Sequence, residues 1–219
     1  MAYIVTIAQQ KGGAGKTSLA AHLAATWSAD KGRRVALFDL DPQKSLTRWF
    51  QVRSENMGDA NTLTLWPSQG WRISAELTRA KREADVILID SPGKDDLGTR
   101  TAVRAADIVV MPVQPSPMDV WASKPTLDLI AKEGSLALIV LNRLPSRAKL
   151  TDHLIVDLKR GSVPIARSAL GNRISFAASL VDGKGITEAE PHSVAAAEIK
   201  LLADEIWRKV APSARKVAA

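Results

Sequence analysis

The chain has 219 residues, of which 46% are hydrophobic and 24% charged, and its formal net charge is +7. This size and composition fit one globular domain, and the basic charge permits binding to nucleic acid or acidic lipid without identifying either. There is no cysteine, which excludes disulfides, thiolate metal sites and cysteine-ligated iron–sulfur clusters. No secretory signal is visible at the N-terminus, and no apolar run approaches the roughly 18 residues of a transmembrane helix.

Short segments rich in β-branched residues alternate with longer amphipathic segments. The predicted strands are 3–8, 34–38, 62–66, 86–90, 108–112 and 136–141. The predicted helices are 16–30, 46–53, 73–83, 97–105, 118–132 and 149–159, followed by a last helix over about 193–210. Nearly continuous apolar strands such as ADVILID indicate burial on both faces. The pattern predicts a single α/β domain over 1–211, with a mostly parallel, twisted sheet and helices on both faces, and a frayed tail over 212–219.

A glycine-rich segment, QQKGGAGKT, joins the first predicted strand to the first predicted helix. Glycine lets the backbone curl so that successive N–H groups point at an anion, and the helix starting at Lys16 adds its positive N-terminal end. Gln10 stands where the general P-loop pattern has glycine, but the Gly-Gly-x-Gly-Lys-Thr core is specific. We therefore expect a P-loop NTPase in which Lys16 binds the β- and γ-phosphates and Thr17 binds Mg²⁺. The expected nucleotide ligands are Gly12, Gly13, Ala14, Gly15, Lys16, Thr17 and Ser18.

Lys11 is a second cation in the same segment, five residues before Lys16. Lys16 already serves the phosphates from inside the loop, so we expect Lys11 to emerge on the outer side. There it either meets the phosphates bound by a facing second copy of the chain or is a solvated surface lysine. In the first case a monomer binds the nucleotide and hydrolyses it slowly, because part of the neutralising charge arrives only on dimerisation.

Acidic residues end two of the predicted strands, at the edge where ligands bind in open α/β sheets. Asp39 and Asp41 close the segment VALFDLD, and alternation along an extended chain places both on one side. They are candidates to order Mg²⁺-bound water or to position the attacking water, although one of them can instead cap the next helix. Asp90 ends VILID, the form of a Walker B element whose acid holds Mg²⁺ through water. The expected metal ligands are thus Thr17 directly, and Asp39 and Asp90 through water.

Lys11, Lys16, the Asp39 and Asp41 pair and Asp90 together resemble the deviant Walker A ATPases of the ParA/MinD group, over nearly the whole chain. The segments DLDPQKSLTRW and PVQPSPMDVWA resemble the short ParA partition ATPases, especially the ParF type. The resemblance implies a slow ATPase that uses ATP and Mg²⁺, releases ADP, and forms an ATP-dependent sandwich homodimer or a higher-order polymer. It also implies nonspecific DNA binding by the ATP form, and a centromere-binding or adaptor protein that stimulates hydrolysis. We expect a cytoplasmic, nucleoid-associated protein of plasmid or chromosome segregation.

The resemblance also carries over residue by residue. Lys11 matches the lysine that reaches across the dimer, Asp41 the acid that positions the attacking water, and Asp39 its supporting neighbour. Asp90 matches the Walker B acid. Asn142, in VLNRL after the sixth predicted strand, resembles the asparagine that contacts adenine in many members.

Basic residues, among them Arg143, are dense in the second half of the chain. Dimerisation would double any patch that they form. Arg173, in LGNRISF, lies where related proteins often carry an arginine that touches DNA, and Lys200 and Arg208 on the last helix are weaker candidates. The other interpretation of these side chains is a set of solvated basic faces.

Three other classes of protein share parts of this pattern. A MinD-like ATPase that acts at a membrane or positions a protein cluster is the main alternative; the apolar stripe of the last helix fits it, but a helix packed on the sheet shows the same stripe. A small-molecule ligase such as dethiobiotin synthetase shares the core, but no substrate pocket is identifiable. An electron donor of the nitrogenase iron-protein type is excluded by the missing cysteines. The cargo, whether plasmid, chromosome, chemoreceptor cluster or microcompartment, is left open.

Overall fold

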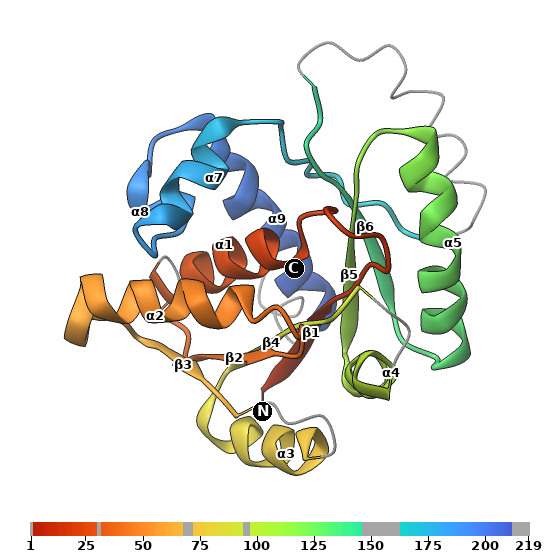
Figure 1. Cartoon of the computed structure of the whole chain (residues 1–219), viewed down its shortest axis with the longest axis horizontal. Helices are drawn as coiled ribbons and strands as arrows, with labels where there is room; N and C mark the ends of the chain where they lie inside the picture. Colours follow the sequence, from red (N-terminus) through yellow and green to blue (C-terminus); the bar gives the residue numbers. More distant parts are fainter. Residues whose placement is uncertain (1, 30–31, 68–71, 94–96, 146–162, 212–219) are drawn as a thin grey trace, which may run out of the picture.

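The computed structural model describes residues 2–29, 32–67, 72–93, 97–145 and 163–211. These residues form one sheet between two layers of helices (Figure 1). The strands are β1 (Tyr3–Ile7), β2 (Val35–Asp39), β3 (Leu63–Leu65), β4 (Val86–Asp90), β5 (Ile108–Val113) and β6 (Ala137–Leu141). They lie in the order β3-β2-β4-β1-β5-β6, and each neighbouring pair is parallel. The predicted parallel sheet is therefore confirmed.

The helices cover both faces of this sheet. They are α1 (Lys16–Ala29), α2 (Ser45–Met57), α3 (Ile73–Glu83), α4 (Leu97–Ala105), α5 (Pro117–Lys132), α7 (Ile174–Val181), α8 (Ile186–Ala189) and α9 (Val194–Val210), with a short 3₁₀ turn at Gly58–Ala60. The first five and the last match predicted helices, although α2 continues beyond Arg53 to Met57. The predicted helix at 149–159 and the tail at 212–219 lie outside the described residues. Neither α7 nor α8 was predicted, because a short apolar segment such as ISFAASLV does not distinguish helix from strand by its periodicity.

Successive residues of each strand point to opposite faces of the sheet. Val5 and Ile7 pack in a cluster with side chains of α1, α2, α8 and α9, whereas Ile4 packs with side chains of α3 and α4. Figure 1 shows α1, α2, α7, α8 and α9 on one side of the sheet and α3, α4 and α5 on the other. Both faces are covered, and this is why the strands are apolar throughout rather than alternating.

The carboxyl ends of the central strands meet at one edge of the sheet. Asp39, the last residue of β2, is the register partner of Asp90, the last residue of β4. Asp90 is in turn the register partner of Ile7 at the end of β1, where the glycine-rich segment begins. The sheet order therefore brings the two acidic segments and the glycine-rich segment together.

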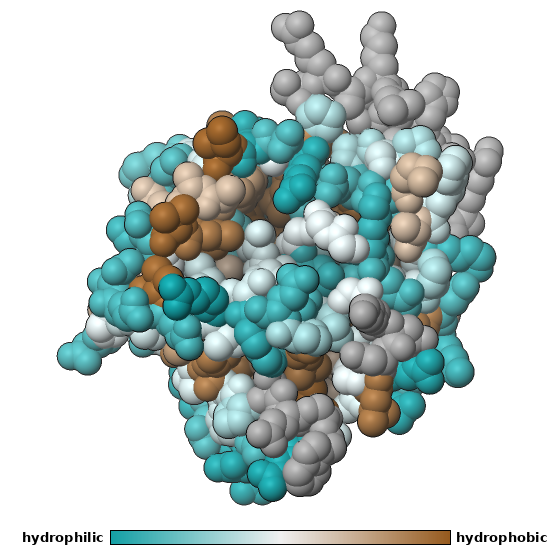
Figure 2. Space-filling view, in the orientation of Figure 1, coloured by the Kyte–Doolittle hydropathy of each residue, from teal (hydrophilic) through white to brown (hydrophobic). Residues whose placement is uncertain are grey.

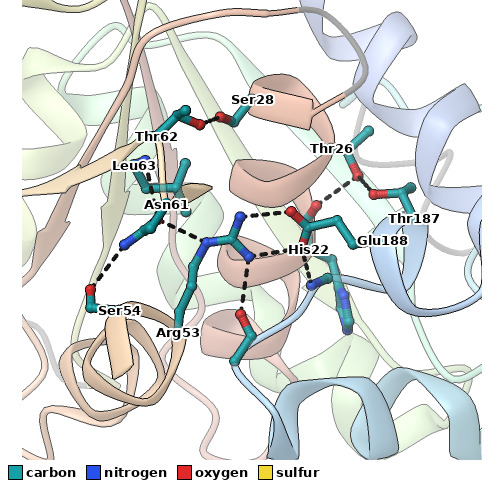
Figure 3. A network of polar contacts seen from close by, with 12 residues as sticks. His22, Thr26, Ser28, Arg53, Ser54, Asn61, Thr62, Leu63, Thr187 and Glu188 are labelled. Atoms are coloured by element: carbon teal, nitrogen blue, oxygen red, sulfur yellow. Dashed lines mark hydrogen bonds and ion pairs between the residues drawn. The ribbon is translucent and has the colours of Figure 1, made fainter. Parts of the chain in front are cut away.

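A buried polar network fastens the segment that holds α7 and α8 to α2 (Figure 3). Arg53 is 1% exposed, and its guanidinium pairs with both carboxylate oxygens of Glu188 at 2.7 and 2.6 Å. It also donates to the carbonyl of Gly183 at 3.0 Å and to Asn61 Oδ1 at 2.9 Å. Gly183 has φ 71°, and a Cβ there would collide with the Arg53 backbone, so the close approach requires glycine. The network holds α2 and the α7–α8 segment in one arrangement, since a buried bidentate pair is costly to break.

The last helix packs its apolar stripe inward. Ile199, Leu202 and Ile206 are 0% exposed, and all three belong to the core cluster under α1. This stripe is therefore part of the core and is not a membrane-binding face. No helix within the described ranges combines the length and the apolar character that a membrane crossing requires.

Candidate functional site

The glycine-rich segment forms a loop between β1 and α1, and side chains from the ends of β5 and β6 hydrogen-bond to it. Gly13 and Gly15 have φ of 77° and 92°, which the curled backbone requires. Gln114, beyond β5, donates to the Gly13 carbonyl at 2.9 Å, and Asn142, beyond β6, donates to the Ala14 carbonyl at 2.8 Å. These contacts fasten two loop carbonyls to the residues that follow β5 and β6, and the loop leads directly into the N-terminus of α1, where an anion site is expected.

A cavity of about 740 Å³, the first cavity, opens over this loop. It is lined by Gly12, Gly13, Gly15, Lys16, Thr17, Ser18 and Ala21 from the loop and α1, by Asp41, Pro42 and Gln43, by Ser45, Arg48, Trp49 and Val52 of α2, and by Pro92, Gly93, Arg143 and Leu180. Lys16 is 8% exposed, and a Cβ at Gly93 would lie 3.6 Å from its Nζ. The predicted nucleotide ligands of the loop, except Ala14, therefore line one concave space of the size that small-molecule sites have.

Thr17 and Asp90 contact each other beside this cavity. The Thr17 hydroxyl donates to Asp90 Oδ2 at 2.7 Å. Asp90 is 0% exposed, and its Oδ1 has no hydrogen-bond partner among the described residues. Burial raises the pKa of the Asp90 carboxyl to about 7, against the lowering effect of the Thr17 hydrogen bond. A buried, unpartnered carboxylate oxygen beside a hydroxyl fits a magnesium ion held through water.

Asp39 and Asp41 have different environments, although the sequence places them on one side. Asp39 is buried: its Oδ2 accepts from the Thr47 amide and hydroxyl, both at 2.8 Å, and its Oδ1 accepts from the Asp41 amide at 3.1 Å. Asp41 lines the first cavity, and its Oδ1 accepts from the Gln43 amide at 2.9 Å. Asp39 thus organises the loop that carries Asp41 and caps the start of α2, whereas Asp41 faces the cavity. The expected capping role belongs to Asp39.

Lys11 lies outside the first cavity. Its Nζ is 2.7 Å from Asp119 Oδ2, and the two side chains are 34% and 7% exposed. The Ser116 hydroxyl donates to the same carboxylate, and Ser116 caps α5 by accepting from the Asp119 amide at 3.2 Å. Sequence reasoning missed Asp119, although the Ser116-x-x-Asp119 spacing is a helix-capping signal.

A second cavity of about 430 Å³ adjoins the first. Its walls include Asn142, Leu170, Phe176 and His22. His22 is 2% exposed; its Nδ1 accepts from the Ile186 amide at 3.1 Å, so its Nε2 carries the proton and donates to the Phe176 carbonyl at 3.0 Å. Burial lowers the pKa of His22 to about 4, which keeps the ring neutral at pH 7. The wall thus combines an amide, apolar groups and a neutral ring.

Exposed apolar surface lies beside both cavities. Figure 2 shows it as brown atoms over the α7 region. Ile174 is 88% exposed and lines the second cavity, and Val181 is 75% exposed next to Leu180 of the first cavity. Exposed apolar patches of this kind mark surfaces that contact other molecules.

The three candidate DNA residues do not share one environment. Arg173 is held by Glu198, which its Nη2 contacts at 2.7 Å and its Nε at 3.2 Å. This hydrogen bond raises the pKa of Arg173, whose charge is largely balanced by the carboxylate. Arg208 is exposed on α9 and its Nε donates to the Asp204 carbonyl, while Lys200 is half-buried on the same helix. A common DNA-binding face for the three remains a prediction.

Comparison with known proteins agrees with this geometry. The profile of the CobQ/CobB/MinD/ParA nucleotide binding domain family matches residues 5–213. The chain is 27% identical over 212 residues to the Maintenance of carboxysome distribution protein A of Halothiobacillus neapolitanus, covering 94% of this chain and 96% of that protein. It is 36% identical over 135 residues to the chromosome-partitioning ATPase Soj of Thermus thermophilus, covering 50% of this chain and 54% of that protein.

Among solved structures, the fold matches the septum site-determining protein MinD of Pyrococcus horikoshii, complexed with Mg-ADP. The TM-score is 0.76 at 20% identity, and the match covers 94% of this chain and 96% of that one. The profile match over most of the chain, together with the phosphate loop and the Thr17–Asp90 pair beside it, leads to one assignment. The chain belongs to the CobQ/CobB/MinD/ParA family of nucleotide-binding domains.

Proposed function

We propose that the chain is an ATP-hydrolysing switch that dimerises on ATP and thereby positions a large cargo, either a DNA molecule or a protein assembly. The observation that carries the proposal is the separation of two lysines from one loop. Lys16 is buried in the wall of the first cavity, whereas Lys11 lies outside that cavity and pairs with Asp119. Because Lys16 already serves the phosphates of its own chain, a second lysine outside the cavity is placed to act on the phosphates bound by another copy.

The nucleotide spans both cavities in this proposal. The amides from Gly12 to Ser18 and the Lys16 ammonium bind the phosphates, and the second cavity takes adenine, with the Asn142 amide as a polar contact and Phe176 as an apolar one. Thr17 holds Mg²⁺ directly and Asp90 holds it through water, since Asp90 Oδ1 has no hydrogen-bond partner in the described part of the chain. When bound, the metal neutralises charge on the phosphates.

Hydrolysis depends on residues of two protomers. Asp41 faces the first cavity and positions the attacking water, and Asp39 fixes the loop that presents Asp41. Lys11 of a second copy supplies the remaining positive charge, so turnover is slow in the monomer and is accelerated further by an adaptor protein. Loss of the γ-phosphate removes what Lys11 binds across the dimer, and the dimer then opens.

Cargo positioning rests on the relatives and on the basic charge. One relative, Soj, is named as a chromosome-partitioning ATPase, and the other is named for the maintenance of carboxysome distribution. The match to the carboxysome protein covers nearly the whole of both chains. The ATP dimer binds DNA nonspecifically, with a Kd on the order of 10⁻⁴–10⁻⁶ M that depends strongly on salt. The proposed DNA contacts are Arg173, Lys200 and Arg208. The protein then acts in the cytoplasm, bound to the nucleoid. Partition of DNA and positioning of a protein assembly use the same switch and differ in the adaptor.

Light scattering with the ATP analogue AMPPNP and Mg²⁺ tests the proposal. The wild-type chain should pass from monomer to dimer when the nucleotide is added. Lys11→Ala should retain nucleotide binding, because Lys16 binds the phosphates within the same chain. It should lose dimerisation, because Lys11 no longer reaches the phosphates bound by the second copy. Lys81→Ala is the matched control, since Lys81 is exposed on α3, on the other face of the sheet from the helices α1 and α2 that line the first cavity. A Lys11→Ala chain that dimerises like the wild type would refute the switch.

A further inference from the structure

Arg143 has an unusual backbone for an arginine. It follows Asn142 at the end of β6 and has φ 54°, in the left-handed region that favours glycine. Among the described residues, Lys44 is the other non-glycine residue with positive φ. The Arg143 amide donates to Asn142 Oδ1 at 3.0 Å, while the Asn142 amide donates to the Val113 carbonyl at 2.9 Å. The chain thus holds Arg143 in a conformation that its side chain disfavours, as residues at functional sites often are.

This conformation places Arg143 between the two cavities. Both cavities are lined by Gly15, Ser18 and Arg143, and no other described residue lines both. The first cavity holds the phosphate loop, and the second holds the apolar wall with Asn142. A nucleotide whose terminal phosphates lie in the first cavity and whose base lies in the second must pass these three residues. The part of ATP between its β-phosphate and its ribose is the α-phosphate.

We infer that Arg143 is a nucleotide-binding residue whose guanidinium binds the α-phosphate, an inference that rests on the proposed nucleotide site. Its side chain is exposed, and within the described ranges it makes no hydrogen bond or ion pair. Arg173, the other arginine of the second cavity, is paired with Glu198. Of the two described arginines that line the second cavity, Arg143 is therefore the one whose donors are available, and a planar guanidinium matches phosphate oxygens in pairs.

The assignment separates Arg143 from the basic residues expected to contact DNA. A residue of the DNA surface would act on DNA affinity and leave nucleotide affinity unchanged. A residue at the γ-phosphate would discriminate ATP from ADP. A residue at the α-phosphate serves both nucleotides equally, since both carry that group.

Nucleotide titrations of Arg143→Gly test the inference. Glycine adopts the left-handed backbone without strain, so the variant should fold and melt no lower than the wild type without nucleotide. Affinity for ADP and for the ATP analogue AMPPNP should fall together by roughly tenfold or more, as expected for a lost charge-assisted hydrogen bond. Arg143→Lys, which keeps the charge, should recover part of the loss. Arg82→Ala, an exposed change of the same charge on α3, should match the wild type.

Two results overturn the inference. Unchanged affinity of Arg143→Gly for both nucleotides removes Arg143 from the site, and a loss confined to AMPPNP moves it to the γ-phosphate. A wild-type chain that binds neither nucleotide refutes the proposed site itself, so the two failures are distinguishable. A change in DNA affinity alone assigns Arg143 to the DNA surface instead.

Discussion

Lys11 Nζ lies 2.7 Å from Asp119 Oδ2, although the two residues are 108 positions apart in the chain. Asp119 lies in the first turn of α5, is mostly buried and also accepts from the Ser116 hydroxyl. The lysine proposed to complete another protomer's site is thus paired with a carboxylate of its own protomer. Dimerisation must replace this ion pair, because a buried carboxylate left without its cation is destabilising.

Asp119→Asn should therefore favour the dimer. Removing the carboxylate charge weakens the tie on Lys11 while keeping the shape of the side chain. The dimer dissociation constant with AMPPNP should fall severalfold, measured by analytical ultracentrifugation. Asp128→Asn is the matched control on the same helix, since its pair with Lys124 is exposed and contributes little. Weaker dimerisation by Asp119→Asn would show that Asp119 supports the dimer rather than opposing it.

Asp90→Asn should stabilise the fold and at the same time abolish the effect of magnesium on nucleotide binding. Burial raises the pKa of Asp90 from 3.8 to about 7, so the folded state disfavours the carboxylate, and this residue's contribution to stability is lost as pH rises from about 4 through 7. Without nucleotide, the variant should gain stability relative to the wild type between pH 5 and pH 8, measured by urea unfolding. Magnesium should no longer increase its nucleotide affinity. A stability difference that does not change with pH would contradict the raised pKa.

His22→Gln should change the acid sensitivity of the fold. Burial lowers the pKa of His22 from 6.5 to about 4, so the unfolded chain binds the proton first and stability falls as pH drops from about 6.5 to about 4. Between these two pH values, one such group changes the free energy of unfolding by up to about 1.4 kcal/mol per pH unit. Urea unfolding at pH 7 and pH 5 should show a smaller decline for His22→Gln than for the wild type. The exposed His192→Gln should keep the wild-type decline, and an identical decline in all three proteins would count against the buried neutral ring.

Glu198→Gln tests whether Arg173 contacts DNA. The bidentate pair with Glu198 balances the Arg173 charge, so its removal should strengthen DNA binding by the ATP dimer severalfold. Arg173→Glu should weaken that binding and lower the salt slope by about one. Glu205→Gln gives the same charge change on α9, where Glu205 accepts from the backbone of residues 167 and 168. Equal gains from both glutamine variants would attribute the effect to net charge and not to Arg173.

The strands were predicted to within two residues, whereas α7 and α8 were missed. Each strand is a short apolar run bounded by polar or turn residues. Because helices cover both faces of the sheet, nearly every residue of a strand is buried, and the run is continuous in the sequence. α7 and α8 depend on distant partners: Arg53 reaches across to Glu188, and His22 holds the backbone of α7 and of the α8 start. Their helical form is stabilised by those contacts and not by a local pattern, since isolated helices of this length are marginal.

The phosphate loop, the Thr17 hydroxyl and the acid at the end of β4 were determined by the sequence alone, because each depends on neighbours along the chain. A curled backbone needs glycines a few positions apart, and a helix start follows directly from the next residues. The tertiary structure alone decided which distant groups meet: Lys11 with Asp119, Arg173 with Glu198, and Arg143 with the junction of the two cavities. Such pairs follow from strand order and helix packing, which no local stretch of sequence specifies.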